Sequence, residues 1–272
     1  MAHLFQVGAG SGGMVVLDLL ARDPAIDRVT LVEPDVYKPH NVYRHLLPAS
    51  DIGRLKVGAA ADWLWDRRPG LTVEALAVDL TAADQQERLN EAIAACDVGV
   101  CAADNEPAKF HFDQLFRRAG KPWTLGEVLS GGIAGWVHRF VTGGPCYGCV
   151  ASHLQRESAG GDPLAPAPDY SHPAGTVPET TIPASRASVG TIAGLHAAVT
   201  LGLLADPPGD GAWTSLLLPL AKVPGVFDDP LRTYRFAVAR NPGCLVCSAT
   251  PSPAGEDLDA ALNAALARLG YD

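Results

Sequence analysis

The sequence predicts an α/β fold built on a mostly parallel sheet, and three features carry this prediction. A glycine-rich turn at residues 8–13, GAGSGG, separates a short apolar run from an apolar-periodic segment. Segments with strand and helix patterns then alternate up to about residue 128, which is the signature of a doubly wound parallel sheet. Two Cys-x-x-Cys pairs follow in the second half of the chain, where we expect an antiparallel extension of the sheet.

The glycine turn predicts a nucleotide-binding start to a Rossmann-like sheet. We expect a strand at residues 4–7 and a helix at residues 14–20, with Gly8, Gly10 and Gly13 in G-x-G-x-x-G spacing between them. Such a turn points backbone N–H groups and a helix N-terminus at an anionic ligand. By itself the pattern is weak, and a chance glycine turn is the alternative.

A second strand, expected at residues 28–32, ends in Glu33, where a carboxylate can take the ribose hydroxyls of a nucleotide. An unusual density of polar groups follows this strand end, and its members are Asp35, Asn41, Arg44 and Lys56. A hydride-transferring dehydrogenase does not need these groups, whereas ATP chemistry does. We also expect His40 and His45, which flank Asn41 and Arg44, to line the nucleotide cleft.

The other elements continue the alternation. We expect helices at residues 53–67, 82–95, 107–119 and 190–204, strands at 71–80, 97–102, 122–128 and 131–141, and strand-like runs at 213–223 and 233–239. Residues 158–183 are rich in Pro, Gly and Ala and have no apolar period, which predicts a long mobile crossover or lid loop. A leucine stripe predicts a C-terminal helix over residues 256–272.

Asp104 and Asn105 come directly after the strand expected at residues 97–102. Ligands of open α/β sheets bind outside the carboxyl ends of the strands, so Asp104 is placed for a metal and nucleotide role. The alternative is that Asp104 only caps the helix that follows it.

The composition excludes several classes of protein. The formal charge is −9 with only 21 Lys and Arg residues, which argues against a nucleic-acid surface. The N-terminus has no basic region followed by an apolar stretch, so we expect no signal peptide and a cytoplasmic protein. We also expect no membrane contact, because we judge that no uncharged run approaches the roughly 18 residues needed to span a membrane.

The cysteine pairs, Cys146 with Cys149 and Cys244 with Cys247, predict a structural zinc site of four thiolates. Free or redox-active thiols are the alternative, but neither pair opens a helix after a strand in the thioredoxin manner. Cys96 and Cys101 fall in or beside an expected buried strand, so we interpret them as core residues.

With these residues in place, the sequence resembles the ThiF/MoeB family, the adenylating relatives of ubiquitin-activating enzymes. The resemblance runs from about residue 7 to 247. It rests on GAGSGG, VEPDVYKPHNVYRHLL, GRLK, ADN, PCYGC and RNPGCLVC in this order. It implies an adenylation domain over residues 1–255 and a homodimer that uses ATP·Mg to adenylate the C-terminal carboxylate of a ubiquitin-like protein, sulfur carrier or peptide.

The resemblance also implies roles for individual residues. Glu33 would hold the ribose, Asn41, Arg44 and Lys56 the phosphates, and Asp104 the magnesium. A carboxylate that attacks the α-phosphate meets electrostatic repulsion, so catalysis depends on positioning and charge neutralisation. We therefore take Arg44, Lys56 and Asp104 as the catalytic candidates. Arg44 as a surface ion-pair partner and Lys56 as a solvated helix residue are the alternatives.

The chain departs from the family in four places. Glu33 replaces the usual Asp, and Lys109 and Asp113 stand where the family has an arginine and an asparagine. The segment VPETTIPASRAS has no cysteine, so we expect the reaction to stop at the acyl-adenylate, or this adenylate to pass to a nucleophile on another chain. The N-terminal helix of the relatives, whose arginine reaches the neighbouring subunit's ATP, is also absent. Either the partner subunit supplies another cation, with Arg22 and Arg54 as candidates, or an upstream segment is missing.

Two other functions compete with this one. An NAD- or FAD-dependent oxidoreductase would use the same glycine turn but gives no reason for Arg44, Lys56 and Asp104. A catalytically silent subunit that docks a ubiquitin-like partner would not need the glycines and these three residues together.

Overall fold

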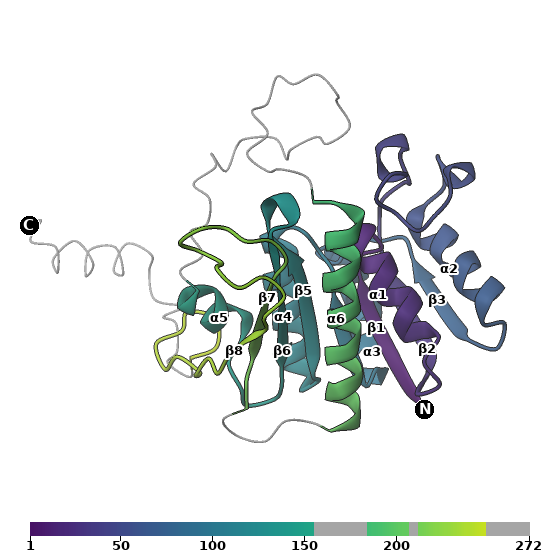
Figure 1. Ribbon diagram of the computed structural model, residues 1–272. Helices are drawn as coiled ribbons and strands as arrows, with labels where there is room; N and C mark the ends of the chain where they lie inside the picture. Colours follow the sequence, from purple (N-terminus) through teal and green to yellow (C-terminus); the bar gives the residue numbers. More distant parts are fainter. Residues whose placement is uncertain (155–183, 207–211, 249–272) are drawn as a thin grey trace, which may run out of the picture.

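The computed structural model describes residues 1–154, 184–206 and 212–248. Its eight-stranded sheet has the order β3-β2-β1-β4-β5-β6-β7-β8 (Figure 1). The strands are β1 (Ala2–Val7), β2 (Ile26–Val32), β3 (Thr72–Leu76), β4 (Val98–Cys101), β5 (Trp123–Val128), β6 (Ala134–Phe140), β7 (Ser215–Pro219) and β8 (Tyr234–Phe236). The helices are α1 (Ser11–Ala21), α2 (Lys56–Arg67), α3 (Gln86–Ala95), α4 (Glu106–Ala119), α5 (Tyr147–His153) and α6 (Arg186–Ala205), with short 3₁₀ turns at Pro39–Asn41, Ala49–Asp51, Ala83–Gln85 and Ser130–Gly132.

The sheet confirms the predicted fold class. Strands β1 to β5 pair in parallel, and β6, β7 and β8 add an antiparallel extension beyond β5. Val7 at the end of β1 pairs with both Val32 of β2 and Cys101 of β4. The segments that follow these three strands therefore start side by side at one edge of the sheet.

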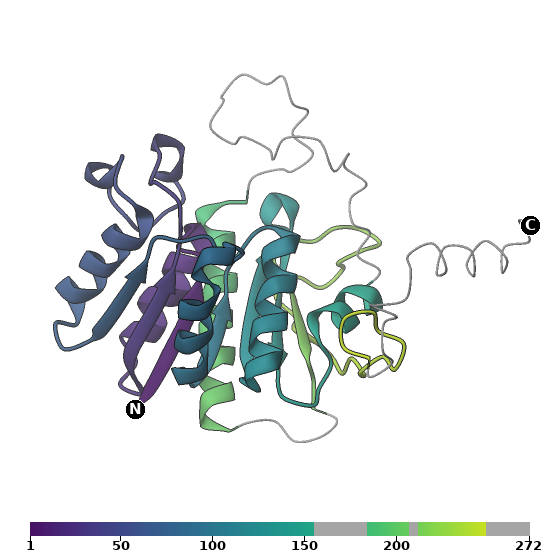
Figure 2. The ribbon, with the colours of Figure 1, turned by 180° about the vertical axis from the view of Figure 1, so that it is seen from behind.

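Helices cover both faces of the sheet. Apolar residues of α1, α2 and α6 pack on one face, and those of α3, α4 and α5 pack on the other (Figures 1 and 2). Along β1 the side chains alternate between the two layers, with Leu4 in the first and Phe5 and Val7 in the second. The sheet is thus buried on both sides, as parallel sheets require.

The glycine turn is forced by close packing at the end of β1. Gly8 has φ 93°, which favours glycine, and a Cβ atom on Gly13 would lie 2.4 Å from the carbonyl oxygen of Gly8. The Gln6 side chain, buried beneath the turn, donates from Nε2 to the carbonyl oxygens of Gly8 and Gly13. The predicted strand, turn and helix are therefore present, with α1 beginning at Ser11.

The helix predicted at residues 190–204 begins earlier, at Arg186, because the Ser185 hydroxyl accepts the Ser188 N–H as an N-cap. Helix α5 was not predicted; it starts at Tyr147, inside the first cysteine pair. The crossover loop expected at residues 158–183 and the helix expected at 256–272 lie outside the described residues.

Helix α6 corrects the expectation about uncharged runs. Residues 187–205 contain no Asp, Glu, Lys or Arg, and among the described helices α6 is long and apolar enough to cross a membrane by length and composition alone. One face of α6 packs on α1 and on strands β5 and β6, and the residues of its other face are partly or fully exposed. The buried side chain of His196 in this helix is hydrogen-bonded to the side chain of Thr124 in β5, and the distance from Nε2 to Oγ1 is 2.9 Å.

Burial of His196 predicts acid-sensitive stability. Burial lowers the pKa of His196 to about 4, so between pH 6.5 and 4 the unfolded chain binds a proton that the folded chain does not. The free energy of unfolding should therefore fall by up to about 1.4 kcal/mol per pH unit as the pH drops through this range. Urea denaturation from pH 7.5 to 5.5 measures this slope. The slope should be shallower for His196→Asn than for wild type or for the exposed-site control His153→Gln; equal slopes in all three proteins would contradict the assignment.

Candidate functional site

The backbone of Ala9, in the middle of the glycine turn, is held on both sides by buried side chains. Its N–H donates to Oε2 of Glu33 at 2.7 Å. Its carbonyl oxygen lies 2.7 Å from Nε2 of His45. Both side chains are buried, with 6% and 2% of their surfaces exposed. The segment after β2 and the segment around residue 45 therefore fix the turn in one conformation.

His45 acts as a neutral hydrogen-bond donor in this arrangement. The N–H of Leu47 donates to Nδ1, so Nε2 carries the proton and donates to Ala9. Burial lowers the pKa of His45, the hydrogen bond to Ala9 opposes this, and the positive charges of Lys56 and Arg186 lower it further. The His45 side chain thus contacts the backbone of the glycine turn and positions it, and the expectation that His40 and His45 line the nucleotide cleft stays a prediction.

Glu33 also binds the segment that follows it. Its Oε1 accepts the N–H of Asp35 at 3.0 Å, so both carboxylate oxygens hold backbone in this structure. Contact between Glu33 and a ribose stays a prediction. A glutamate reaches the Ala9 N–H from the end of β2, which gives a structural reason for Glu33 in place of the shorter aspartate that the family usually has.

Lys56 begins α2 and lies 2.8 Å from Asp35, measured from Nζ to Oδ2. Its side chain is 10% exposed and that of Asp35 is 63% exposed. The alternative of a solvated helix residue is therefore wrong for Lys56. An ion pair with an exposed aspartate contributes little to stability, so this ammonium can exchange Asp35 for another anion at small cost.

The other two residues predicted to bind phosphates differ from each other. Oδ1 of Asn41 accepts the N–H of Lys38 and so shapes its own 3₁₀ turn. Arg44 is half-buried, and within the described residues its side chain makes no hydrogen bond or ion pair. The alternative of Arg44 as a surface ion-pair partner finds no support in this part of the chain.

The sequence left two roles open for Asp104, ligand binding and capping of the next helix, and the structure assigns the capping role to Asn105. Asn105 is the N-cap of α4, and its Oδ1 accepts the Ala108 N–H at 2.9 Å. Asp104 is exposed, and within residues 1–154, 184–206 and 212–248 its carboxylate has no partner. The cap alternative for Asp104 is therefore wrong, and its carboxylate is free to bind a ligand at the edge formed by β1, β2 and β4.

Arg186 is a cation at this edge that the sequence analysis missed. It is the first residue of α6, and its Nη1 donates to the carbonyl oxygen of His45 at 2.6 Å. Val189, one turn on, lies 3.6 Å from the position a Cβ on Gly12 would take. The available signal was one arginine directly before a long uncharged helix, which is too common a pattern to single out.

The start of α1 is open to an anion. Among the described residues, no side chain caps this helix and a Cβ on Gly10 would meet no atom within 4 Å; the first turn of the helix has no acidic residue. The free N–H groups of such a turn bind phosphate groups. The two candidates for a cation acting on the partner subunit are already paired in this chain, Arg22 with Asp18 and Arg54 with Asp51 and Asp62.

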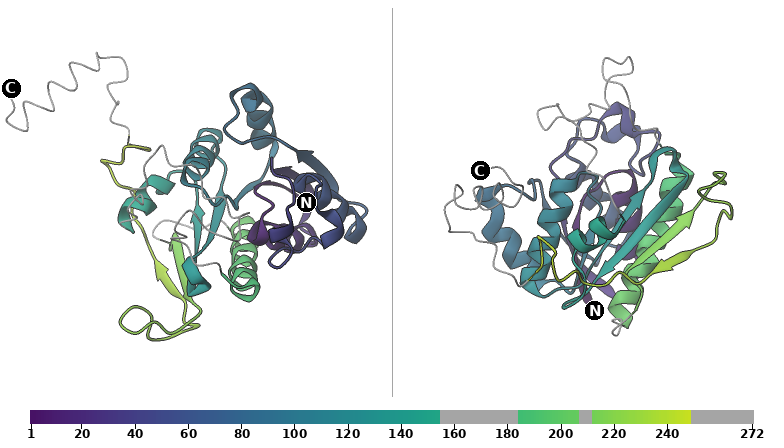
Figure 3. Two further views of the ribbon diagram at one scale, coloured as in Figure 1. Left: turned by 90° about the horizontal axis from the view of Figure 1, so that it is seen from above. Right: turned by 90° about the vertical axis from the view of Figure 1, so that its left-hand side faces the viewer.

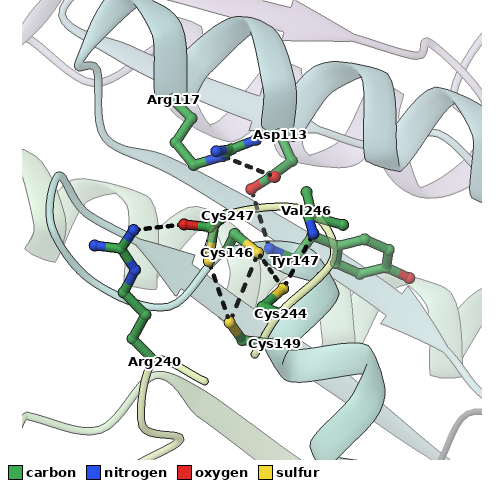
Figure 4. Close-up of polar contacts among 9 residues, drawn as sticks. All are labelled: Asp113, Arg117, Cys146, Tyr147, Cys149, Arg240, Cys244, Val246 and Cys247. Atoms are coloured by element: carbon green, nitrogen blue, oxygen red, sulfur yellow. Dashed lines mark hydrogen bonds and ion pairs between the residues drawn. The ribbon is translucent and has the colours of Figure 1, made fainter. Parts of the chain in front are cut away.

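The four cysteines form a buried cluster on the side of the molecule away from β3 (Figures 3 and 4). The sulfur atoms of Cys146 lie 3.7 Å from Cys149 and 3.6 Å from Cys244, and those of Cys149 and Cys247 are 3.5 Å apart. These separations exclude disulfides. Tetrahedral zinc, with Zn–S bonds of roughly 2.3 Å, places its sulfur ligands roughly 3.8 Å apart. The cluster therefore fits zinc.

The thiols of this cluster need a cation. Burial raises the pKa of the Cys146 and Cys149 thiols. For Cys244 burial acts in the same direction, but the N–H groups of Val246 and Cys247 lower its pKa to about 7. A bound metal ion would deprotonate all four, because thiolates are the metal ligands.

The two departures from the family pattern in α4 are buried and structural. Lys109 donates to Glu106 at 2.7 Å and to Glu127 at 2.6 Å. Oδ1 of Asp113 accepts the N–H of Tyr147, the first residue of α5, at 3.0 Å. Helix α4 thus connects the segment that contains Asp104 with the cysteine cluster, because its Asp113 fixes the start of α5, the helix that contains Cys149.

A model of the ThiF family matches residues 1–225. The chain belongs to the ThiF family. This ThiF family protein is 27% identical over 260 residues to the SAMP-activating enzyme E1 of Haloferax volcanii, a match that covers 95% of this chain and 84% of the relative.

Structures of E. coli MccB with ATP, and of the microcin C7 biosynthetic enzyme MccB with N-formylated MccA, are also similar to this ThiF family protein. The TM-scores are 0.63 and 0.65 at 18% identity. Each match covers 91% of this chain and 67% of the MccB chain, so this chain spans about two thirds of the length of MccB. At this identity the likeness shows a shared fold.

The cysteine cluster predicts one zinc ion per chain. Chelation should lower the melting temperature, because removing a structural zinc ion leaves four buried thiols and destabilises the fold by several kcal/mol. Metal analysis and thermal unfolding of the intact chain measure both effects. Cys244→Ser should lose zinc and Cys96→Ala should keep it; a full zinc content in Cys244→Ser would contradict the site.

Proposed function

We propose that this chain adenylates the C-terminal carboxylate of a protein or peptide with ATP. The observation that carries the proposal is the edge formed by β1, β2 and β4, where a fixed glycine turn and an open helix start lie beside the Asp104 carboxylate, which has no partner among the described residues. Arg44, Lys56 and Arg186 supply positive charge to the segments around this edge. Membership of the ThiF family supports the same reaction and removes the reason to propose an oxidoreductase.

The reaction joins a carboxylate oxygen of the acceptor to the α-phosphorus of ATP, and the bond from that phosphorus to the β-phosphate bridging oxygen breaks. The products are an acyl-adenylate and pyrophosphate, so no proton transfer is required. The turn and the start of α1 would bind phosphate oxygens through N–H groups. Lys56, Arg44 and Arg186 would offset the negative charge of both reactants, which is the main barrier to their approach.

Magnesium would neutralise part of the triphosphate charge, and Asp104 is the residue we propose to hold it. One exposed carboxylate fits this ion, because Mg²⁺ in nucleotide sites takes one or two carboxylates and completes its coordination with phosphates and water. Asn41, Asp35, Glu33 and Asn105 remain proposed nucleotide contacts near the same edge.

The acceptor that we propose is a ubiquitin-like protein, a sulfur-carrier protein or a peptide with a free C-terminus. Two relatives support this class by name, the SAMP-activating enzyme E1 and MccB with its partner MccA. A homodimer and a cytoplasmic location belong to the same proposal. A catalytically silent docking subunit is the alternative that the exchange assay below excludes or supports.

The exchange of pyrophosphate into ATP tests the proposal. Asp104→Ala should reduce acceptor-dependent exchange to background, because the metal-bound phosphates lose their protein ligand. The melting temperature should not change, since the Asp104 carboxylate is exposed and unpaired in the described structure. Asp84→Ala, at another exposed position, is the matched control. Full exchange in Asp104→Ala would remove Asp104 from the site, and no exchange in wild type with any acceptor would support the silent subunit.

We also propose that the reaction on this chain ends at the acyl-adenylate. The segment VPETTIPASRAS has no cysteine, and Cys96 and Cys101 are buried thiols whose pKa burial raises to about 12. A thiolate nucleophile is therefore not available at either of these positions.

Incubation with ATP and an acceptor should give an AMP-linked product and no covalent enzyme–acceptor adduct. Non-reducing gels with and without hydroxylamine, followed by intact mass measurement, detect either species. A thiol-linked, hydroxylamine-sensitive adduct on this chain would overturn the proposal while leaving adenylation intact.

A further inference from the structure

A polar cavity lies away from the nucleotide edge, between the first residue of β5, the end of β6 and the cysteine cluster. Its volume is about 130 Å³. Three cationic side chains line it, Arg117 near the end of α4, Lys121 before β5 and Arg240 before the second cysteine pair. Asp113 is the acidic residue that lines it.

Apart from the cysteine cluster, the side chains that line this cavity carry more positive than negative charge. Oδ1 of Asp113 accepts the Tyr147 N–H, and its Oδ2 pairs with Nε of Arg117 at 3.3 Å. Lys121 donates to the carbonyl oxygen of Cys96 at 2.7 Å. Arg240 donates to the carbonyl oxygen of Cys247 at 2.5 Å, a contact that Figure 4 shows. Neutral carbonyl groups orient these two cations without cancelling their charge. Two of the three cations thus have no anionic partner within the described chain.

The cysteine cluster does not use these cations as hydrogen-bond donors. Its sulfur atoms accept backbone N–H groups, that of Asn241 at Cys149 and that of Val246 at Cys244, both at 3.4 Å. The four thiolates and a zinc ion would carry a net charge of −2, so long-range attraction to the cations remains. If this attraction were their only role, neutralising them would change zinc retention and no ligand would bind.

The wall of the cavity leaves room for a ligand. Residues 142–144 form a turn in which Gly143 has φ 82°, and a Cβ at this position would meet no atom of the described residues within 4 Å. The volume suits one tetrahedral oxyanion and is well below the roughly 300–1,000 Å³ of pockets for drug-sized ligands. Guanidinium and ammonium groups that converge on one space are the usual protein partners of phosphate.

We propose that this cavity binds a single phosphate group, held by Arg117, Lys121 and Arg240 beside the metal centre. The site is separate from the adenylation proposed above and goes beyond it. The phosphate group could belong to inorganic phosphate or to the monoester of a small metabolite.

Inorganic phosphate is the probe for the first test. The zinc-loaded full chain is saturated with AMP to occupy the nucleotide edge and titrated with phosphate by calorimetry at constant ionic strength. We expect saturable binding, weakened roughly tenfold or more in Lys121→Gln and in Arg240→Gln. Arg88→Gln, an exposed site that pairs with Glu74 elsewhere, should bind like wild type.

Control measurements keep the test decisive. Zinc content and melting temperature in chloride are measured for every variant, and Lys121→Arg should restore binding if charge is what matters. Binding of a small phosphate monoester in place of inorganic phosphate identifies the second source. The absence of saturable phosphate binding in wild type, or equal affinity in the Lys121 and Arg240 variants, would overturn the proposal. Neither result bears on pyrophosphate exchange, so the two proposals fail separately.

Discussion

The fixed backbone conformation of Ala9 is the constraint on which the candidate nucleotide site depends. Parallel pairing brings the ends of β1, β2 and β4 together, and Glu33 and His45 then hold the N–H and the C=O of one residue, and so two successive peptide groups of the glycine turn. Both are buried, and His45 is neutral because burial lowers its pKa. A turn held in this way can present its N–H groups to phosphate without a further cost of ordering.

Charge around the turn is arranged so that ligand binding can replace weak internal contacts. Lys56 pairs with an exposed aspartate, Arg186 donates to a neutral carbonyl, and Arg44 has no partner in the described chain. An arriving triphosphate would therefore break no strong interaction in order to gain three cationic ones. The buried ions of α4 behave differently, since Lys109 and Asp113 are fully engaged and connect the nucleotide edge to the cysteine cluster. Helix α4 thus links the candidate nucleotide site to the cysteine cluster.

Local pattern was enough to predict much of the fold. The glycine spacing, the alternation of strand and helix and the two cysteine pairs each report a backbone or ligand requirement that few residues satisfy, so the sheet and the convergence of the four cysteines were predicted correctly. Contacts between distant segments were not predictable. Nothing in the sequence shows that His45 lies beneath Ala9, that Asn105 and not Asp104 caps α4, or that Arg186 reaches the loop before α2. The uncharged run in α6 was overlooked, and the packing of one face of this helix on α1, β5 and β6 became known only from the structure.

A structure of the complex with Mg²⁺ and a non-hydrolysable ATP analogue is the most direct test of the central claim. We predict that the triphosphate lies over residues 8–13, that Lys56 has left Asp35 for a phosphate oxygen, that Arg44 and Arg186 approach the phosphates, and that Asp104 contacts the metal ion. A nucleotide bound elsewhere, or bound at the turn with Arg44, Lys56 and Asp104 all directed away from it, would contradict the account.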